Sequence, residues 1–188
     1  MDTKDKLLLH RASAHGDLEK VENLIATGWD IECRDDNGAT PLFAACFKGQ
    51  VEIAKFLIGK GADVNRGKDV RYTPLMTASR EKHPEVVRLL LEAKADTELA
   101  AASGMKAIHW ALMDTLPRNT APFETETTLM EILTLLRKHG ADINAKGENG
   151  ETPLMDAAWW GLVEVTKYLV SCGARRDEKD KDGQTAMD

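Results

Sequence analysis

The sequence predicts an all-α fold built from short helix pairs that stack side by side, and three observations point to it. Leu and Ala supply most of the apolar residues, while aromatic residues are only 5% of the 188, a balance that favours helices over a β-sandwich. The motif Thr-Pro-Leu recurs at Thr40, Thr73 and Thr152. A second motif, Gly-Ala-Asp, recurs in the same register at Gly61 and Gly140. Motifs that keep a fixed period indicate a repeat architecture.

The Thr-Pro-Leu motif sets a constant register along the chain, with a period of about 33 residues, which is typical of helix-pair repeats. Thr40 and Thr73 are one period apart, and Lys106, which begins a degenerate copy, follows Thr73 by the same interval. Thr152 lies more than one period beyond Lys106, so the fourth unit carries extra residues. A last partial copy begins at Thr185, one period after Thr152.

Each motif has a defined place in a helix pair. In the second unit, the hydroxyl of Thr40 is expected to cap free helix amides, and Pro41 suits the first helical position because its missing N–H costs nothing there. Gly49 permits the left-handed residue that ends a short helix. The apolar residues of 51–58 recur at helical spacing and predict a second helix, which Gly61 ends.

The stretch from Gly38 to Asn65, GATPLFAACFKGQVEIAKFLIGKGADVN, resembles the consensus of ankyrin repeats, and the resemblance covers essentially the whole chain. It implies an ankyrin-repeat solenoid of stacked helix–turn–helix units with projecting β-turn fingers, in one domain over 1–188. The third unit departs from the pattern, because Lys82 and Lys94 replace its two glycines. We expect units at about 5–35, 36–68, 69–101, 102–147 (with an insertion at 115–127) and 148–180, and a partial unit at 181–188.

The insertion in the fourth unit contains Pro117 and Pro122 together with a run of Thr and Glu residues up to Thr127. This composition predicts an exposed loop between the two helices of the unit. Two interpretations stay open: a tolerated surface insertion, since loop tips accept such changes at little cost, or a loop used in recognition or regulation.

Composition and motifs argue against catalysis and against nucleic acid as a partner. The net charge is −6, whereas a protein that neutralises phosphates needs a basic excess or a basic stripe. The spacing around Gly67-Lys68 does not fit a phosphate-binding loop, and the histidines form no His-Glu-x-x-His array. The resemblance implies structural hydrogen bonding for His10 and His109. We expect no enzymatic activity, no cofactor and no metal site.

The expected location is the cytoplasm, with the nucleus as an alternative. The N-terminal residues lack the apolar stretch of a secretory signal, and no run is long enough for a membrane span. The three cysteines form no Cys-x-x-Cys pair, which favours reduced thiols. We expect a monomer, unless the unfinished C-terminal unit is covered by another chain. The alternative explanation of the unfinished unit is a native protein that continues beyond Asp188.

Two asparagines are candidates for modification. Asn65 and Asn144 end the sequences GADVN and GADIN, which resemble sites that a cellular asparaginyl hydroxylase modifies in ankyrin repeats. The alternative interpretation is that both are turn residues whose side chains hydrogen-bond the backbone of the fingers.

The resemblance places a partner-binding groove on the fingers and on the exposed side of each first helix. Trp159-Trp160 is its most distinctive feature, because Trp is a frequent hot-spot residue, although one of the pair could instead pack inward. Six acidic and two basic side chains in the groove predict a partner with an apolar anchor and basic residues. The groove residues are expected to be Asp36, Asn37, Ala39, Phe47, Lys48, Asp69, Tyr72, Arg80, Glu81, Ser103, Met105, Trp110, Met113, Asp114, Glu148, Glu151, Trp159 and Trp160.

The sequence therefore predicts a non-catalytic protein–protein interaction module that acts as an adaptor, scaffold or inhibitor. The alternative is a targeting or regulatory domain of a larger enzyme or effector protein, which the unfinished last unit suggests.

Overall fold

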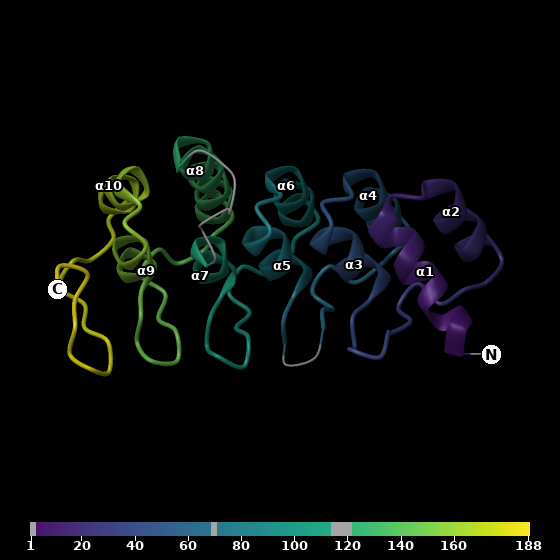
Figure 1. Cartoon of the computed structure of the whole chain (residues 1–188), viewed down its shortest axis with the longest axis horizontal. Coiled ribbons are helices and arrows are strands. Elements are labelled where there is room, and N and C mark those ends of the chain that lie inside the picture. Colours follow the sequence, from purple (N-terminus) through teal and green to yellow (C-terminus); the bar gives the residue numbers. More distant parts are fainter. Residues whose placement is uncertain (1–2, 69–70, 114–121) are drawn as a thin grey trace.

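The chain folds into two layers of helices with a row of turns projecting below them (Figure 1). The computed structural model describes residues 3–68, 71–113 and 122–188, and these contain ten α-helices and no strand. The first helices of the units lie side by side in one layer: α1 (Thr3–His15), α3 (Pro41–Phe47), α5 (Pro74–Arg80), α7 (Ala107–Leu112) and α9 (Pro153–Trp159). The second helices form the other layer: α2 (Leu18–Ala26), α4 (Val51–Gly59), α6 (Pro84–Glu92), α8 (Pro122–Lys138) and α10 (Val163–Ser171). The all-α solenoid is confirmed.

The Thr-Pro pairs start the first helices in the expected way. The hydroxyl of Thr40 accepts a hydrogen bond from the backbone N–H three residues on (3.2 Å), and Thr73 and Thr152 do the same at 3.2 and 3.4 Å. A proline occupies the first turn after each of these threonines. Each cap therefore satisfies an amide that has no partner within its own helix.

The core is a continuous apolar layer between the two rows of helices, running from Leu9 to Ala174. Two buried histidines in this layer bond to backbone carbonyls outside their own helices, His10 across to the second unit and His109 within the fourth. His10 donates from Nε2 to the carbonyl of Ala39 (2.9 Å), and the fully buried His109 donates to the carbonyl of Ala145 (3.1 Å). The expected structural role of these two histidines is confirmed.

A ladder of side-chain hydrogen bonds joins each finger to the next. Glu32, Asn65, Glu98 and Asn144 accept from the backbone N–H of a residue in the following unit, at 2.8, 2.8, 3.1 and 2.8 Å. Asn144 also donates from Nδ2 to the carbonyl of Gly173 (3.4 Å). Both asparagines singled out in the sequence therefore bond to the neighbouring unit, and their hydroxylation stays a prediction.

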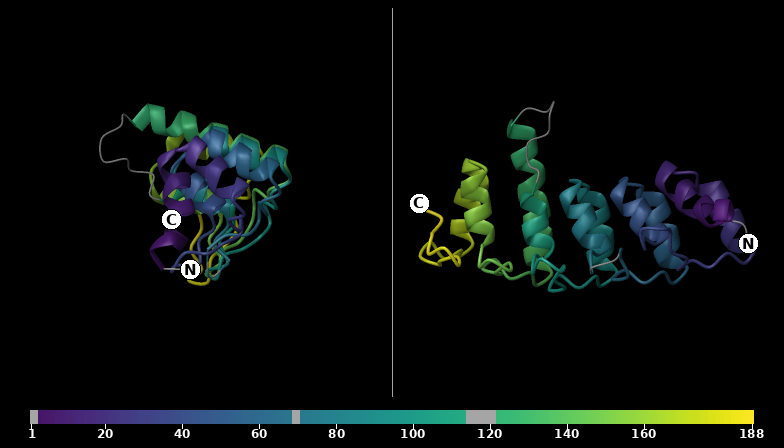
Figure 2. Two further views of the ribbon diagram at one scale, coloured as in Figure 1. Left: turned by 90° about the vertical axis from the view of Figure 1, so that its right-hand side faces the viewer. Right: turned by 60° about the horizontal axis from the view of Figure 1, so that its bottom comes forward.

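The predicted loop in the fourth unit is wrong for residues 122–127, which form the first turns of α8. This helix has 17 residues where the other second helices have nine, and it extends beyond the layer (Figure 2). Pro122 stands at its first position, where proline is tolerated, and the buried Leu129, Ile132 and Leu136 continue the helical spacing. Residues 114–121 lie outside the described residues.

The two lysines that replace glycines adopt the left-handed conformation of the glycines they replace. The φ angles of Lys82 and Lys94 are 60° and 67°, against 68° for Gly49 and 91° for Gly61. Lys82 has a further role, because its Nζ donates to the carbonyls of Arg80, Ala111 and Met113 at 3.0, 2.8 and 3.0 Å. No helix in the described part of the chain is long and apolar enough to cross a bilayer.

Candidate partner-binding surface

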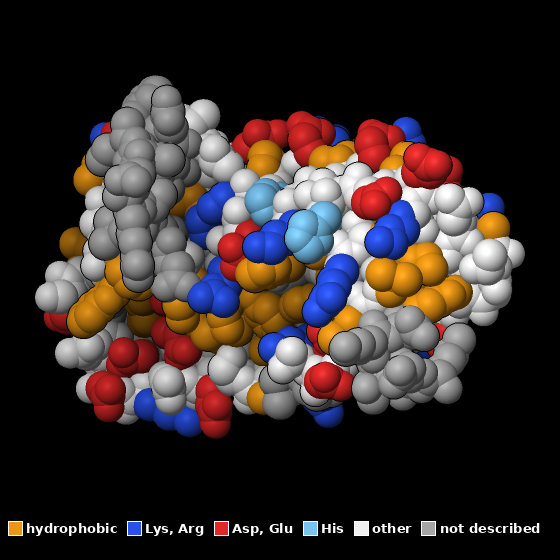
Figure 3. Space-filling view, turned by 45° about the vertical axis from the view of Figure 1, so that its right-hand side comes forward, with side chains coloured by type: hydrophobic (Ala, Val, Ile, Leu, Met, Phe, Trp, Pro, Cys, Tyr) orange, Lys and Arg blue, Asp and Glu red, His pale blue; other side chains and the backbone are white. Residues whose placement is uncertain are grey.

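The first helices and the turns that precede them share one solvent-exposed face of the molecule, which we call the concave surface. It consists of the exposed sides of α3, α5, α7 and α9 and of the finger turns below them. In Figure 3 apolar side chains form a band across this part of the molecule, with basic side chains above the band and acidic ones below it at the left. Two hollows in this surface contain most of the sequence-predicted site residues.

The central hollow has a volume of about 560 Å³ and is lined by residues 36–37, 68, 72 and 101–103 of the finger turns together with residues of α5 and α7. The ring of Tyr72 packs edge-on between Phe43 (5.8 Å between centroids) and Trp110 (4.7 Å). The guanidinium of Arg80 lies 5.9 Å from the centre of the Trp110 ring. Burial raises the pKa of Tyr72, so this aromatic row is uncharged. The predicted residues that line the hollow are Asp36, Asn37, Tyr72, Arg80, Ser103 and Trp110.

The C-terminal hollow, of about 740 Å³, lies beside α9. The two adjacent tryptophans in the wall of this hollow differ in their exposure to solvent. Trp159 is 83% exposed, whereas Trp160 is half-buried and packs against the core. Met113 and Glu151, both predicted, also line this hollow. Trp159 therefore offers an indole that the fold itself does not use.

Two carboxylates line the C-terminal hollow. Oε2 of Glu151 and Oδ2 of Asp156 are buried, and neither accepts a hydrogen bond from any described residue. Burial, with a smaller contribution from the charge of Glu151, raises the pKa of Asp156 to about 7. Loss of solvation disfavours the charged form of a carboxyl group, and a like charge nearby adds to that effect. Within the described ranges, no three His, Cys, Asp or Glu side chains are grouped so as to hold a metal ion.

Asp156 was missed by sequence reasoning, although the register contains a signal for it. Glu151 takes the position that Tyr72 holds two units earlier, and Asp156 takes the position of Trp110. Both positions face the concave surface in the central hollow. The change from aromatic to acidic side chains at two matched positions was therefore visible before the structure. Lys68, Met155, Asp180 and Asp182 also line the hollows without having been predicted.

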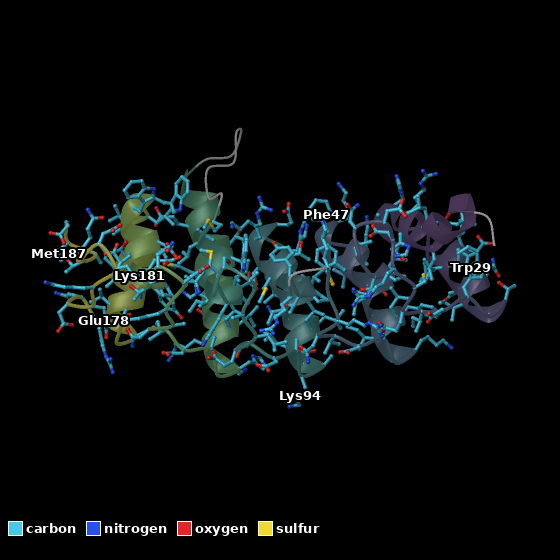
Figure 4. The ribbon with its side chains drawn as sticks, turned by 90° about the horizontal axis from the view of Figure 1, so that it is seen from below. Trp29, Phe47, Lys94, Glu178, Lys181 and Met187 are labelled. Atoms are coloured by element: carbon cyan, nitrogen blue, oxygen red, sulfur yellow. The ribbon has the colours of Figure 1, made fainter. Side chains whose placement is uncertain are left out.

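Several predicted residues lie outside both hollows. Phe47, 39% exposed, ends α3, with the Nζ of Lys48 4.9 Å from its ring centre. Figure 4 shows Phe47 on the edge of the array opposite Lys94. Glu81 is half-buried and lines neither hollow.

Met105 needs a correction. It is only 5% exposed, so a partner cannot contact much of it. Ala39, at 6%, is likewise buried. The predicted residues Asp69 and Asp114 lie outside the described residues.

Comparison with known proteins agrees with the repeat architecture. Protein phosphatase 1 regulatory subunit 27 of Mus musculus is 46% identical over 95 residues, which are 50% of this chain and 53% of that protein. Protein phosphatase 1 regulatory subunit 12A of Mus musculus is 43% identical over 58 residues, 31% of this chain and 6% of that protein. A putative ankyrin repeat protein of Rickettsia felis is 49% identical over 41 residues, 22% of this chain and 65% of that protein.

The chain thus spans about half the length of regulatory subunit 27, and much less of subunit 12A. The model of ankyrin repeats (three copies) matches residues 9–101 and 96–182, which contain the second half of α1 and all of α2 to α10. The chain therefore belongs to the ankyrin-repeat family.

Proposed function

We propose that the chain is a non-catalytic regulatory module that binds another protein across its concave surface. The observation that carries this proposal is the exposed indole of Trp159, 83% accessible beside a hollow of about 740 Å³. A Trp in such a position offers a large rigid area to a partner at small entropic cost. The acidic and apolar lining of the hollow favours a partner segment with an apolar anchor and basic residues.

The test compares the affinity of three forms of the chain for a partner protein: wild type, Trp159→Ala and Val163→Ala. An affinity column that carries each form first captures the partner. Val163 is the matched control, since it is 57% exposed but lies on α10 in the other layer. For a purified partner, we expect Trp159→Ala to weaken binding by about 2 kcal/mol, the range of a hot-spot residue. Titration calorimetry measures the change, and equal affinities for wild type and Trp159→Ala would place the interface elsewhere.

Protein phosphatase 1 is the first candidate partner. Relatives named as its regulatory subunits are 43–46% identical to parts of this chain, and we propose a comparable regulatory role here. Purified catalytic subunit, immobilised for biolayer interferometry, is expected to bind the wild type and to bind Trp159→Ala more weakly. A phosphatase assay with and without the chain then separates inhibition from simple tethering. No binding at micromolar concentrations would remove this enzyme as a candidate.

A further inference from the structure

Two carboxylate oxygens in the C-terminal hollow lack a hydrogen-bond donor among the described residues. Glu151 lies just before α9 and Asp156 lies in the middle of this helix. Each has a buried carboxylate oxygen that accepts no hydrogen bond from the described residues. A buried acceptor without a donor costs free energy, and more so when it carries charge. Two such acceptors in one hollow are therefore a costly arrangement unless a donor enters from outside.

Of the three remaining acids of the hollow, Asp182 is exposed, and Asp180 and Asp188 differ from this pair because they already have partners. Oδ1 of Asp180 accepts from the backbone N–H groups of Asp182 and Gln184 at 3.0 and 2.8 Å. Oδ2 of Asp188 accepts from the backbone and the hydroxyl of Thr185. These side chains stabilise the last turn and add negative potential at the rim. Among the described residues that line the hollow there is no Lys or Arg.

The acidic character belongs to this hollow and not to the whole concave surface. In the central hollow, the described lining contains Lys68 and Arg80 and one acid, Asp36. The partner surface is therefore divided, with positive charge in its middle and negative charge at its C-terminal end. A partner that binds along the concave surface is therefore expected to place a positively charged group at the C-terminal end.

The apolar part of the wall narrows the choice of cation. The indole of Trp159 is open to solvent, and Trp160 and Met155 complete the wall beside the two carboxylates. A guanidinium is planar, stacks on aromatic faces and presents five N–H groups in a fork that fits carboxylates. An ammonium is a strongly hydrated point charge without a stacking face. The combination of two acceptors and an indole favours the guanidinium.

We propose that the C-terminal hollow binds the side chain of an arginine on the partner protein, with Glu151 and Asp156 accepting its N–H groups and Trp159 covering its plane. The inference rests on the proposed function and adds to it the residue that the partner inserts. The acids supply the hydrogen-bond acceptors, and the indole supplies the cation–π contact.

The test uses three heptapeptides, acetyl-Gly-Leu-Gly-X-Gly-Leu-Gly-amide, in which X is Arg, Lys or citrulline, a neutral structural analogue of Arg. Each is titrated into the ¹⁵N-labelled chain, and the indole N–H signals of Trp159 and Trp160 are followed by NMR. We expect the Arg peptide to shift both signals saturably and the citrulline peptide to bind at least about tenfold more weakly, since charge-assisted hydrogen bonds are the stronger ones. Equal binding of the Arg peptide and the Lys or citrulline peptide would overturn the assignment of a guanidinium site.

The double variant Glu151→Gln/Asp156→Asn tests the acceptors directly. We expect it to lose about tenfold in affinity for the Arg peptide, in line with the loss of charge-assisted bonds. The matched control, Glu22→Gln/Glu52→Gln, removes the same charge from exposed acids of α2 and α4 and should bind as the wild type does. Thermal melting verifies that both variants fold, and unchanged affinity in the first variant would overturn the proposal.

Two other outcomes separate this inference from the function on which it rests. A protein partner that depends on Trp159 but binds the Glu151→Gln/Asp156→Asn variant normally would keep the proposed function and overturn the arginine site. Sedimentation velocity tests a second copy of the chain as the occupant. A dimer that dissociates in the same variant would assign the hollow to self-association and would also overturn the proposal.

Discussion

At the scale of single residues, Asp156 links the stability of the last repeat to pH. Burial and the nearby Glu151 raise its pKa to about 7 in the folded chain, whereas Asp in an unfolded chain has a pKa of about 3.9. Between these two values the folded state binds more protons than the unfolded state. The contribution of Asp156 to the free energy of unfolding therefore falls as the pH rises from about 4 to about 7, and it is constant above that range.

Asp156→Asn is expected to remove this dependence. At pH 8 the variant should be more stable than the wild type by no more than about 4 kcal/mol, and near pH 4 the difference should be small. Urea unfolding followed by circular dichroism at both pH values gives the two differences. Comparing variant with wild type cancels the titration of groups far from the site, and equal differences at both pH values would contradict the prediction.

Lys82 and Lys94 have the same left-handed backbone conformation but are expected to have opposite effects on the stability of the fold. A left-handed residue other than glycine carries a cost of the order of 1 kcal/mol. Lys94 is exposed, and its side chain makes no hydrogen bond or ion pair with a described residue that would offset this cost. Lys82 recovers it by donating to the three carbonyls at the ends of α5 and α7.

We expect the two glycine substitutions to change stability in opposite directions. Lys94→Gly should raise the free energy of unfolding by about 0.5–1 kcal/mol by relieving the backbone. Lys82→Gly should lower it by about 2 kcal/mol, because hydrogen bonds from a charged group are lost. Guanidinium unfolding of both variants measures the two effects, and stabilisation by Lys82→Gly would mean that its three hydrogen bonds contribute little.

At the scale of helices, a side chain of α8 caps the N-terminus of α10, the next second helix along the chain. Oε2 of Glu126 accepts from the backbone N–H groups of Glu164 and Val165 at 2.8 and 3.1 Å. These amides lie in the first turn of α10, whose own N-cap residue, Leu162, provides no side-chain hydrogen bond. The extra turns of α8 therefore supply the cap that α10 lacks.

Glu126→Ala is expected to destabilise α10 by about 1 kcal/mol, the usual value of a helix cap. The loss should be local, because the hydrogen bonds that Glu126 accepts in the described structure come from α10. Hydrogen exchange resolves it: protection should fall for the amides of α10 and stay unchanged for those of α4. A uniform loss of protection would instead indicate that the array unfolds as one unit.

The insertion also shows where the sequence was insufficient at this scale. Pro122 and the Thr and Glu residues after it are common in loops, but they are equally compatible with the first turn of a helix. The deciding contact joins Glu126 to amides in the following unit, far along the chain. Local composition contains no information about a partner so distant in the sequence.

At the scale of the whole molecule, the finger ladder links each unit to the next through side-chain hydrogen bonds. Stacked repeats derive their cooperativity from the interfaces between neighbours. Asn65 connects the second unit to the third through the N–H of Asp96 (2.8 Å), near the middle of the array. A weaker interface at this point divides the molecule into two halves.

Asn65→Ala should lower the free energy of unfolding by about 1 kcal/mol and broaden the urea transition, because the two halves begin to unfold separately. Asn149→Ala is the control: it removes an exposed finger asparagine whose side chain makes no hydrogen bond with a described residue and should change stability by less than about 0.5 kcal/mol. Equal effects of the two substitutions would argue against a structural role for the ladder.

Most of the architecture was predictable from sequence because the repeat applies the same local chemistry several times. Thr-Pro caps and apolar spacing act within a few residues, so their outcome can be derived from neighbours in the chain. The candidate site was less accessible. The burial of Met105 and the exposure of Trp159 depend on how adjacent units pack, and one unit alone does not encode that geometry.

The three bonds from Lys82 have a practical consequence for protein engineering. One of them holds the carbonyl of Met113, directly before the point at which this sequence carries its additional residues. A reporter domain inserted between Met113 and Pro122 would thus be joined to a residue whose backbone is hydrogen-bonded to the fold. Because Met113 also borders the C-terminal hollow, such a fusion would place an optical probe next to the proposed arginine pocket and turn occupancy into a measurable signal.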